Sequence, residues 1–108
     1  MDSVFSSLYE TILNRKSNPQ EGSYTCYLLD AGIDKILKKV AEESGETIIA
    51  AKNGDSAEVV NEAADLIFHL MVLLVKSGIP LESLTGELRR RSEKAGNLKQ
   101  FKQVNKNS

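Results

Sequence analysis

The chain has 108 residues, of which 41% are hydrophobic and 27% are charged, and its formal net charge is −1. This composition excludes a disordered protein, because enough apolar side chains are present to form a core. The near-neutral charge gives no indication of a nucleic-acid partner or an anionic membrane. The length predicts a single domain over residues 1–108, and so small a domain commonly buries more surface by forming a dimer.

Three features predict a cytoplasmic protein. The chain has one cysteine, Cys26, which cannot form an intramolecular disulfide and so favours a reducing compartment. The N-terminal segment MDSVFSSLYE lacks the basic and apolar stretches of a secretory signal. The longest apolar run, LIFHLMVLLV, has ten residues, whereas a membrane-spanning helix needs about 20.

The first predicted helix covers residues 3–16. Its apolar residues recur at helical spacing: Val4, Phe5, Leu8, Ile12 and Leu13. A loop follows over residues 17–23, rich in residues that interrupt regular structure. Ser23 can then cap a short helix that Gly32 ends.

A long helix is predicted over residues 33–52. One of its faces gathers the apolar and small residues Ile33, Ile36, Leu37, Val40, Ser44, Thr47, Ile48 and Ala51. The dipeptide Asn53-Gly54 ends this helix. Asp55 begins the next helix, and Glu58 three residues later completes a capping-box pattern.

The second long helix runs to about Ser77 and ends at Gly78. It is apolar on every side over residues 66–75, which predicts burial on every side, partly against a second subunit. Pro80 is typical of the first turn of a last helix, LESLTGELRRRSEKA, and residues 93–108 form a polar tail. The predicted fold is all-α, a bundle of two long and two or three shorter helices completed by dimerisation.

Two pairs of acidic residues are the candidate metal-binding residues. Glu43 and Glu46 are three residues apart, as are Glu62 and Asp65, so each pair lies on one face of its helix. The tight connection at residues 53–55 makes the two long helices antiparallel neighbours. Each pair is about seven residues from that turn, so the four carboxylates are expected to converge at one height of the bundle.

Converging carboxylates repel one another unless a cation lies between them. Ligands that are all oxygen select hard ions, so Mg²⁺ is expected, with Mn²⁺ as a substitute. Lys35 and Lys39 lie on the same stripe as the acids of the first long helix, and Asn53 continues it. Cations beside a metal–carboxylate cluster are typical of a site for a polyphosphate substrate.

Other interpretations of these residues stay open. Acids and lysines at spacings of three and four also form ordinary solvated helix faces. A di-iron bundle would need Glu-x-x-His on two helices, but the single histidine, His69, is not three residues after a glutamate. His69 follows Asp65 by four residues, so it is either a core histidine or a group that acts beside the acids.

The motif EESGE, a gap of fifteen residues, and EAAD together resemble the EExxE…ExxD signature of the MazG-like all-α nucleoside triphosphate pyrophosphatases. The elements SYT, GIDKI, IAAKN and EAADL extend the resemblance over residues 4–92 to the phosphoribosyl-ATP pyrophosphohydrolase family. The resemblance implies an Mg²⁺-dependent homodimeric enzyme. Its reaction would be hydrolysis of phosphoribosyl-ATP to phosphoribosyl-AMP and pyrophosphate, the second step of histidine biosynthesis.

Carried over by position, the resemblance implies metal ligands and catalytic residues at Glu43, Glu46, Glu62 and Asp65, with Glu42 as a helper. It implies substrate-phosphate contacts at Lys35, Lys39, Lys52 and Asn53, and weaker substrate contacts at Ser23, Tyr24 and Thr25. The chain departs from the family at Gly45, where a helix former is usual, and at Phe68, where tyrosine is common. Two alternatives remain: a house-cleaning nucleoside triphosphate pyrophosphatase of the same superfamily, and a non-catalytic helical dimeric adaptor.

Overall fold

The computed structural model describes residues 2–95. This part of the chain is all-α, with two long and three shorter helices and no strand, which confirms the predicted fold class. The helices are α1 (Asp2–Ser17), α2 (Tyr24–Ala31), α3 (Ile33–Lys52), α4 (Ser56–Ser77) and α5 (Leu81–Ala95). Of the predicted polar tail, residues 93–95 belong to α5 and the rest lies outside the described residues.

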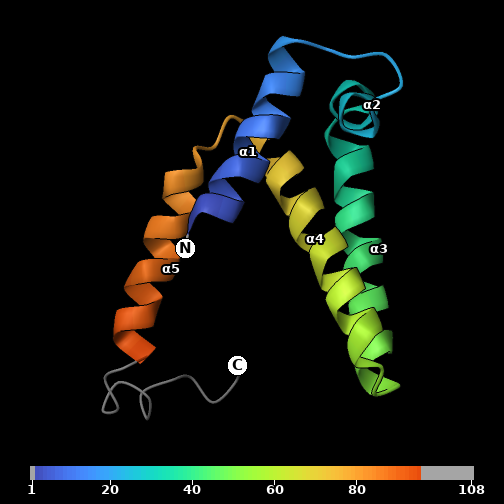
Figure 1. The fold of residues 1–108 in the computed structure, drawn as a ribbon, viewed down its shortest axis with the longest axis vertical. Helices are drawn as coiled ribbons and strands as arrows, with labels where there is room; N and C mark the ends of the chain where they lie inside the picture. Colours follow the sequence, from blue (N-terminus) through green and yellow to red (C-terminus); the bar gives the residue numbers. More distant parts are fainter. Residues whose placement is uncertain (1, 96–108) are drawn as a thin grey trace.

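The antiparallel pair of α3 and α4 forms one arm of the molecule (Figure 1). The short helix α2 lies across the start of α3, and α1 packs near the C-terminal end of α4. No helix within residues 2–95 is long and apolar enough to cross a membrane.

The turn between α3 and α4 follows from three residues. Gly54 has a φ of 70°, the left-handed conformation that glycine adopts most easily. The amide of Asp55 donates to the carbonyl of Ala50, and that of Gly54 to Ala51, which is the Schellman pattern of a helix end. The Asp55 carboxylate then accepts from the amide of Glu58 at 3.1 Å and caps α4. Asp55 therefore takes part in both helix ends: its amide bonds to the last turn of α3, and its carboxylate caps α4. These two bonds hold the two helices in a fixed register.

The hydrophobic core lies where α1, α2, α3 and α4 meet the start of α5. Its buried residues are Tyr9, Ile12, Leu28, Leu29, Ile36, Met71, Val72, Val75 and Leu81. The hydroxyl of Tyr9 donates to the carbonyl of Ile79 at 2.8 Å, so a buried polar group is satisfied across the turn before α5. The core is concentrated at one end of the α3–α4 pair, which leaves the acids nearer the other end.

The face of α3 that gathers the apolar and small residues is only partly buried. Ile33, Leu37 and Ile48 are exposed, whereas Ile36, Glu43 and Ala50 are buried. The buried three are spaced by seven residues, close to two helical turns, so they point in one direction. The middle position of this buried line is Glu43, so hydrophobicity alone does not identify it. In α1, likewise, Val4 is exposed and Tyr9 is buried.

Candidate active site

Glu43 is a buried carboxylate on the face of α3 that meets α4. The residue is only 7% exposed, and Ile36 and Ala50 lie on the same line of the helix. Burying a carboxylate without a partner is costly, so this placement needs compensation from neighbouring groups. The helix can hold Glu43 there because apolar packing on either side fixes the direction of the whole face.

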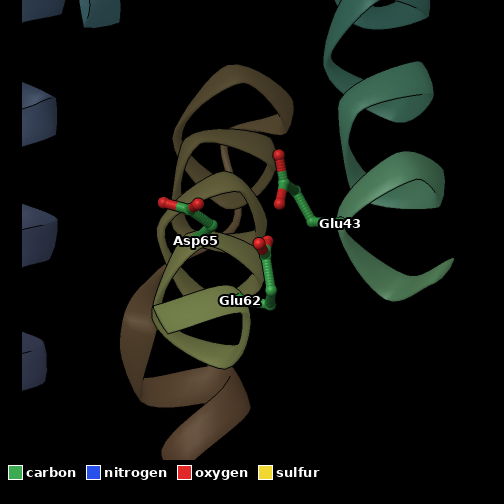
Figure 2. Close-up of side chains that lie close together, drawn as sticks. All are labelled: Glu43, Glu62 and Asp65. Atoms are coloured by element: carbon green, nitrogen blue, oxygen red, sulfur yellow. The ribbon is translucent and has the colours of Figure 1, made fainter. Parts of the chain in front are cut away.

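Glu62 and Asp65 on α4 face Glu43. Figure 2 shows Glu43 reaching from α3 toward the carboxylates of the other helix. One oxygen from each of the three residues lies within 4.8 Å of the others, a spacing at which a single cation could be bound. The structure thus brings together three of the four predicted acids from two antiparallel helices.

Glu46, the fourth predicted acid, lies beside this group but not within it. Its carboxyl interacts with that of Glu62. Both residues line a small pocket of about 260 Å³ that also includes Asn53 and Asp55 from the α3–α4 turn. Glu46 therefore extends the acidic surface from the three-carboxylate group toward the turn.

The carboxylates of Glu43, Glu46 and Glu62 lie close enough to change the pKa of Glu62. The pKa of Glu62 is raised to about 7, chiefly by a hydrogen bond shared with the Glu43 carboxyl, then by burial and by Glu46. Within the described residues, Oε1 of Glu43 and Oε1 of Glu62 are buried without a hydrogen-bond partner. Unpaired buried oxygens are the atoms that a bound cation would satisfy, and a donor set made only of carboxylate oxygens fits a hard divalent ion.

The predicted basic residues flank the acids on α3. Nζ of Lys39 lies 3.4 Å from Oε1 of Glu42 and 3.8 Å from Oε2 of Glu43. Glu42 is exposed, so it pairs with this lysine rather than joining the three-carboxylate group. One turn earlier, Nζ of Lys35 lies 5.8 Å from the ring centroid of Tyr27. Lys52 is exposed at the other end of α3.

Sequence reasoning missed a contact that joins α2 to this site. His69 is buried, and its Nδ1 lies 2.7 Å from the carbonyl oxygen of Asp65. A carbonyl only accepts, so Nδ1 carries the proton and Nε2 accepts the hydroxyl of Tyr24 at 2.9 Å. The spacing of four residues between Asp65 and His69 was visible in the sequence. Tyr24, which bonds to His69, is 45 residues away along the chain, so no local pattern in the sequence indicates this contact.

Comparison with known proteins connects this geometry to a family. The family model described as Phosphoribosyl-ATP pyrophosphohydrolase matches residues 5–92. A protein of Streptococcus thermophilus named Phosphoribosyl-ATP pyrophosphatase is 50% identical over 101 residues, which cover 94% of this chain and 97% of that protein. A protein of the same name from Bacillus cytotoxicus is 48% identical over 104 residues, covering 96% and 97%.

A third relative is longer than this chain. The Histidine biosynthesis bifunctional protein HisIE of Caldanaerobacter subterraneus is 56% identical over 91 residues, which cover 84% of this chain and 44% of that protein. Similarity over most of the chain to proteins of these names shows that the protein is a hydrolase. The chain belongs to the phosphoribosyl-ATP pyrophosphohydrolase family.

Proposed function

We propose that the protein is a cytoplasmic enzyme that hydrolyses phosphoribosyl-ATP to phosphoribosyl-AMP and pyrophosphate, the second step of histidine biosynthesis, with Mg²⁺ as cofactor. Family membership supports the reaction. The observation that supports the cofactor is the approach of three carboxylates to within 4.8 Å, with two buried oxygens that lack a partner. Such a cluster is stabilised when a divalent cation is bound.

Each acid then has a role that its position supports. Glu43, Glu62 and Asp65 hold the cation, and Glu46 completes the acidic surface on the side of the turn. When bound, Mg²⁺ neutralises phosphate charge and lowers the pKa of a coordinated water. The rigid pair of helices keeps the carboxylates in place before the substrate arrives, so little reorganisation is needed during the reaction.

The basic residues of α3 act on the triphosphate. Hydrolysis adds water across the bond between the α- and β-phosphates and releases pyrophosphate. Lys35 and Lys39 stabilise the negative charge that develops on this leaving group. Lys39 is suited to the task because it already lies 3.8 Å from a carboxylate oxygen of Glu43. We propose that Lys52 and Asn53, at the C-terminal end of α3, also contact the substrate phosphates.

The test is pyrophosphate release from phosphoribosyl-ATP, with and without Mg²⁺, beside ATP and several deoxynucleoside triphosphates. We expect release from phosphoribosyl-ATP only, and only with the metal. Release from the simple triphosphates instead would favour a house-cleaning pyrophosphatase. No release from any substrate would favour the non-catalytic adaptor.

We further propose that the protein is a homodimer in which α3 and α4 bury their exposed apolar side chains. Ile48 is 64% exposed and Val60 is 70% exposed. They lie at similar distances on either side of the α3–α4 turn, so they are at the same height of the pair. Light scattering should give twice the mass of the chain, and Ile48→Asp should lower it. A monomer mass for the unaltered protein would contradict the dimer.

A further inference from the structure

A second hollow lies away from the acids, between the C-terminal end of α1, α2 and the end of α4. It has a volume of about 810 Å³, and its lining includes residues 19–23. These residues belong to the loop that joins α1 to α2 (Figure 1). Pockets that bind small ligands typically have about 300–1,000 Å³. The volume is therefore sufficient for a sugar phosphate.

The lining of this pocket is basic on balance. Arg15, Lys16 and Lys76 line it together with the acids Glu21 and Asp30, although the whole chain has a net charge of −1. Nζ of Lys76 donates to the carbonyl of Leu29 at 3.0 Å, which fixes that cation at the pocket wall. A local excess of fixed positive charge favours an anionic ligand.

Arg15 is the residue best suited to bind a phosphate here. Its guanidinium has five N–H donors, of which one contacts Oδ1 of the neighbouring Asn14 at 3.4 Å. The planar fork of donors matches the geometry of a phosphate group. Nζ of Lys16, the next residue, makes a long contact of 3.5 Å with the carbonyl of Val75, so a ligand could displace it at small cost.

Two aromatic rings connect the pocket with the acidic site. Tyr24 and Tyr27 both line the pocket, and they are 47% and 50% exposed. Their ring centroids are 6.1 Å apart at an interplanar angle of 29°, so they form a stacked pair. The hydroxyl of Tyr24 reaches His69, whose ring is bonded to the backbone of Asp65. Tyr24 therefore lines the pocket and is connected through His69 to the backbone of Asp65.

We infer that this pocket binds the phosphoribosyl group of the substrate and that Tyr24 and Tyr27 contact the adenine. The inference rests on the proposed function. Phosphoribosyl-ATP is an adenine nucleotide with two anionic ends, a triphosphate on one ribose and a single phosphate on a second ribose attached to the adenine ring. The acidic site takes the triphosphate, the basic pocket takes the single phosphate, and the exposed ring faces lie between them.

This arrangement makes the pocket a specificity site. ATP lacks the second ribose phosphate, so it leaves the pocket empty and forgoes its charged contacts. Discrimination then comes from Arg15 and Lys16 rather than from the acids, which meet the same triphosphate in both nucleotides. Because these contacts form with the bound ground state as well, their loss should appear mainly in KM.

The test compares Arg15→Gln with Lys94→Gln, which removes the same charge from α5 outside the pocket. We expect kcat/KM for phosphoribosyl-ATP to fall about tenfold or more in Arg15→Gln, mainly through KM, and to stay unchanged in Lys94→Gln. Ribose 5-phosphate should inhibit the unaltered enzyme competitively and inhibit Arg15→Gln more weakly. Lys16→Gln serves as the second pocket variant if Arg15→Gln does not fold.

Each remaining outcome counts against a specific claim. Unchanged kcat/KM in a folded Arg15→Gln protein would overturn the pocket assignment while leaving the proposed function intact. Equal inhibition of the unaltered enzyme and of Arg15→Gln by ribose 5-phosphate would also overturn it, because the Arg15 guanidinium is proposed to bind that phosphate. Absence of any turnover of phosphoribosyl-ATP by the unaltered enzyme would overturn the proposed function, and the pocket assignment with it.

Discussion

The hydroxyl of Tyr24 donates to Nε2 of His69 at 2.9 Å, and this bond ties the first turn of α2 to the middle of α4. His69 is buried, and its other ring nitrogen donates to the carbonyl of Asp65. Both ring nitrogens of His69 therefore have a hydrogen-bond partner. The turn of α4 that contains Asp65 is thus bonded through His69 to Tyr24 of α2.

Replacing Tyr24 with Phe should lower the free energy of unfolding by about 1–3 kcal/mol, because Nε2 of buried His69 then loses its donor. The measurement is the urea midpoint of the purified variant. Tyr27→Phe is the matched control, since Tyr27 is similarly exposed on the same helix and its change should cost less than about 0.5 kcal/mol. Equal effects of the two changes would contradict a special role for the Tyr24 hydroxyl.

Neighbouring glutamates on α3 should differ sharply in their effect on activity. Glu43→Gln removes a buried charge from the three-carboxylate group, so pyrophosphate release should fall at least about 100-fold. Stabilisation of the fold by added Mg²⁺ should be lost as well. Glu42→Gln changes the adjacent, exposed acid that pairs with Lys39, and its activity should stay within about fivefold. Similar losses in both would remove Glu43 from the proposed ligands.

The metal-free protein should become less stable as the pH rises from about 4.5 to about 7. The pKa of Glu62 is raised from 4.5 to about 7 in the folded protein, chiefly by the Glu43 carboxyl. The folded state therefore binds this proton more tightly than the unfolded state does. Its stabilising effect is complete below the unfolded pKa and is lost as the pH passes the folded pKa.

Urea midpoints measured across this pH range, without a divalent cation, test the expectation. Glu62→Gln should show a weaker pH dependence, because its side chain does not titrate. Added Mg²⁺ should reverse the loss at the upper end of the range, since it favours the charged carboxylates. An unchanged slope in Glu62→Gln would assign the pH dependence to other groups.

Gly45→Ala should raise the free energy of unfolding by about 0.5–1 kcal/mol. Gly45 lies inside α3 and a Cβ there would meet no atom within 4 Å, so the change removes only the entropic cost of a helical glycine. Gly86→Ala in α5 has equally open surroundings and should show a similar gain. Destabilisation by Gly45→Ala alone would indicate a close neighbour from a second subunit on this face of α3.

The local features of the fold were predictable from the sequence. Ser23, Asp55 and Gly78 lie at the helix boundaries where their capping preferences place them, because a cap depends on a few adjacent residues. The approach of Glu43 to Glu62 and Asp65 was predictable for a similar reason. A tight turn and a regular helical repeat together determine which residues of two antiparallel helices share a height.

Which apolar side chains of α3 are buried was decided only by the tertiary structure. Hydrophobicity favoured the side that carries Ile48, yet α3 turns Glu43 inward and leaves Ile48 exposed. Burial depends on what the neighbouring helix presents, and α4 presents carboxylates at that height. The bond between Tyr24 and His69 likewise joins residues with no local relation in the chain. Helix ends and register are short-range properties that the sequence by itself determined, whereas the facing of each helix and the contacts between distant residues depend on the packing of the whole fold.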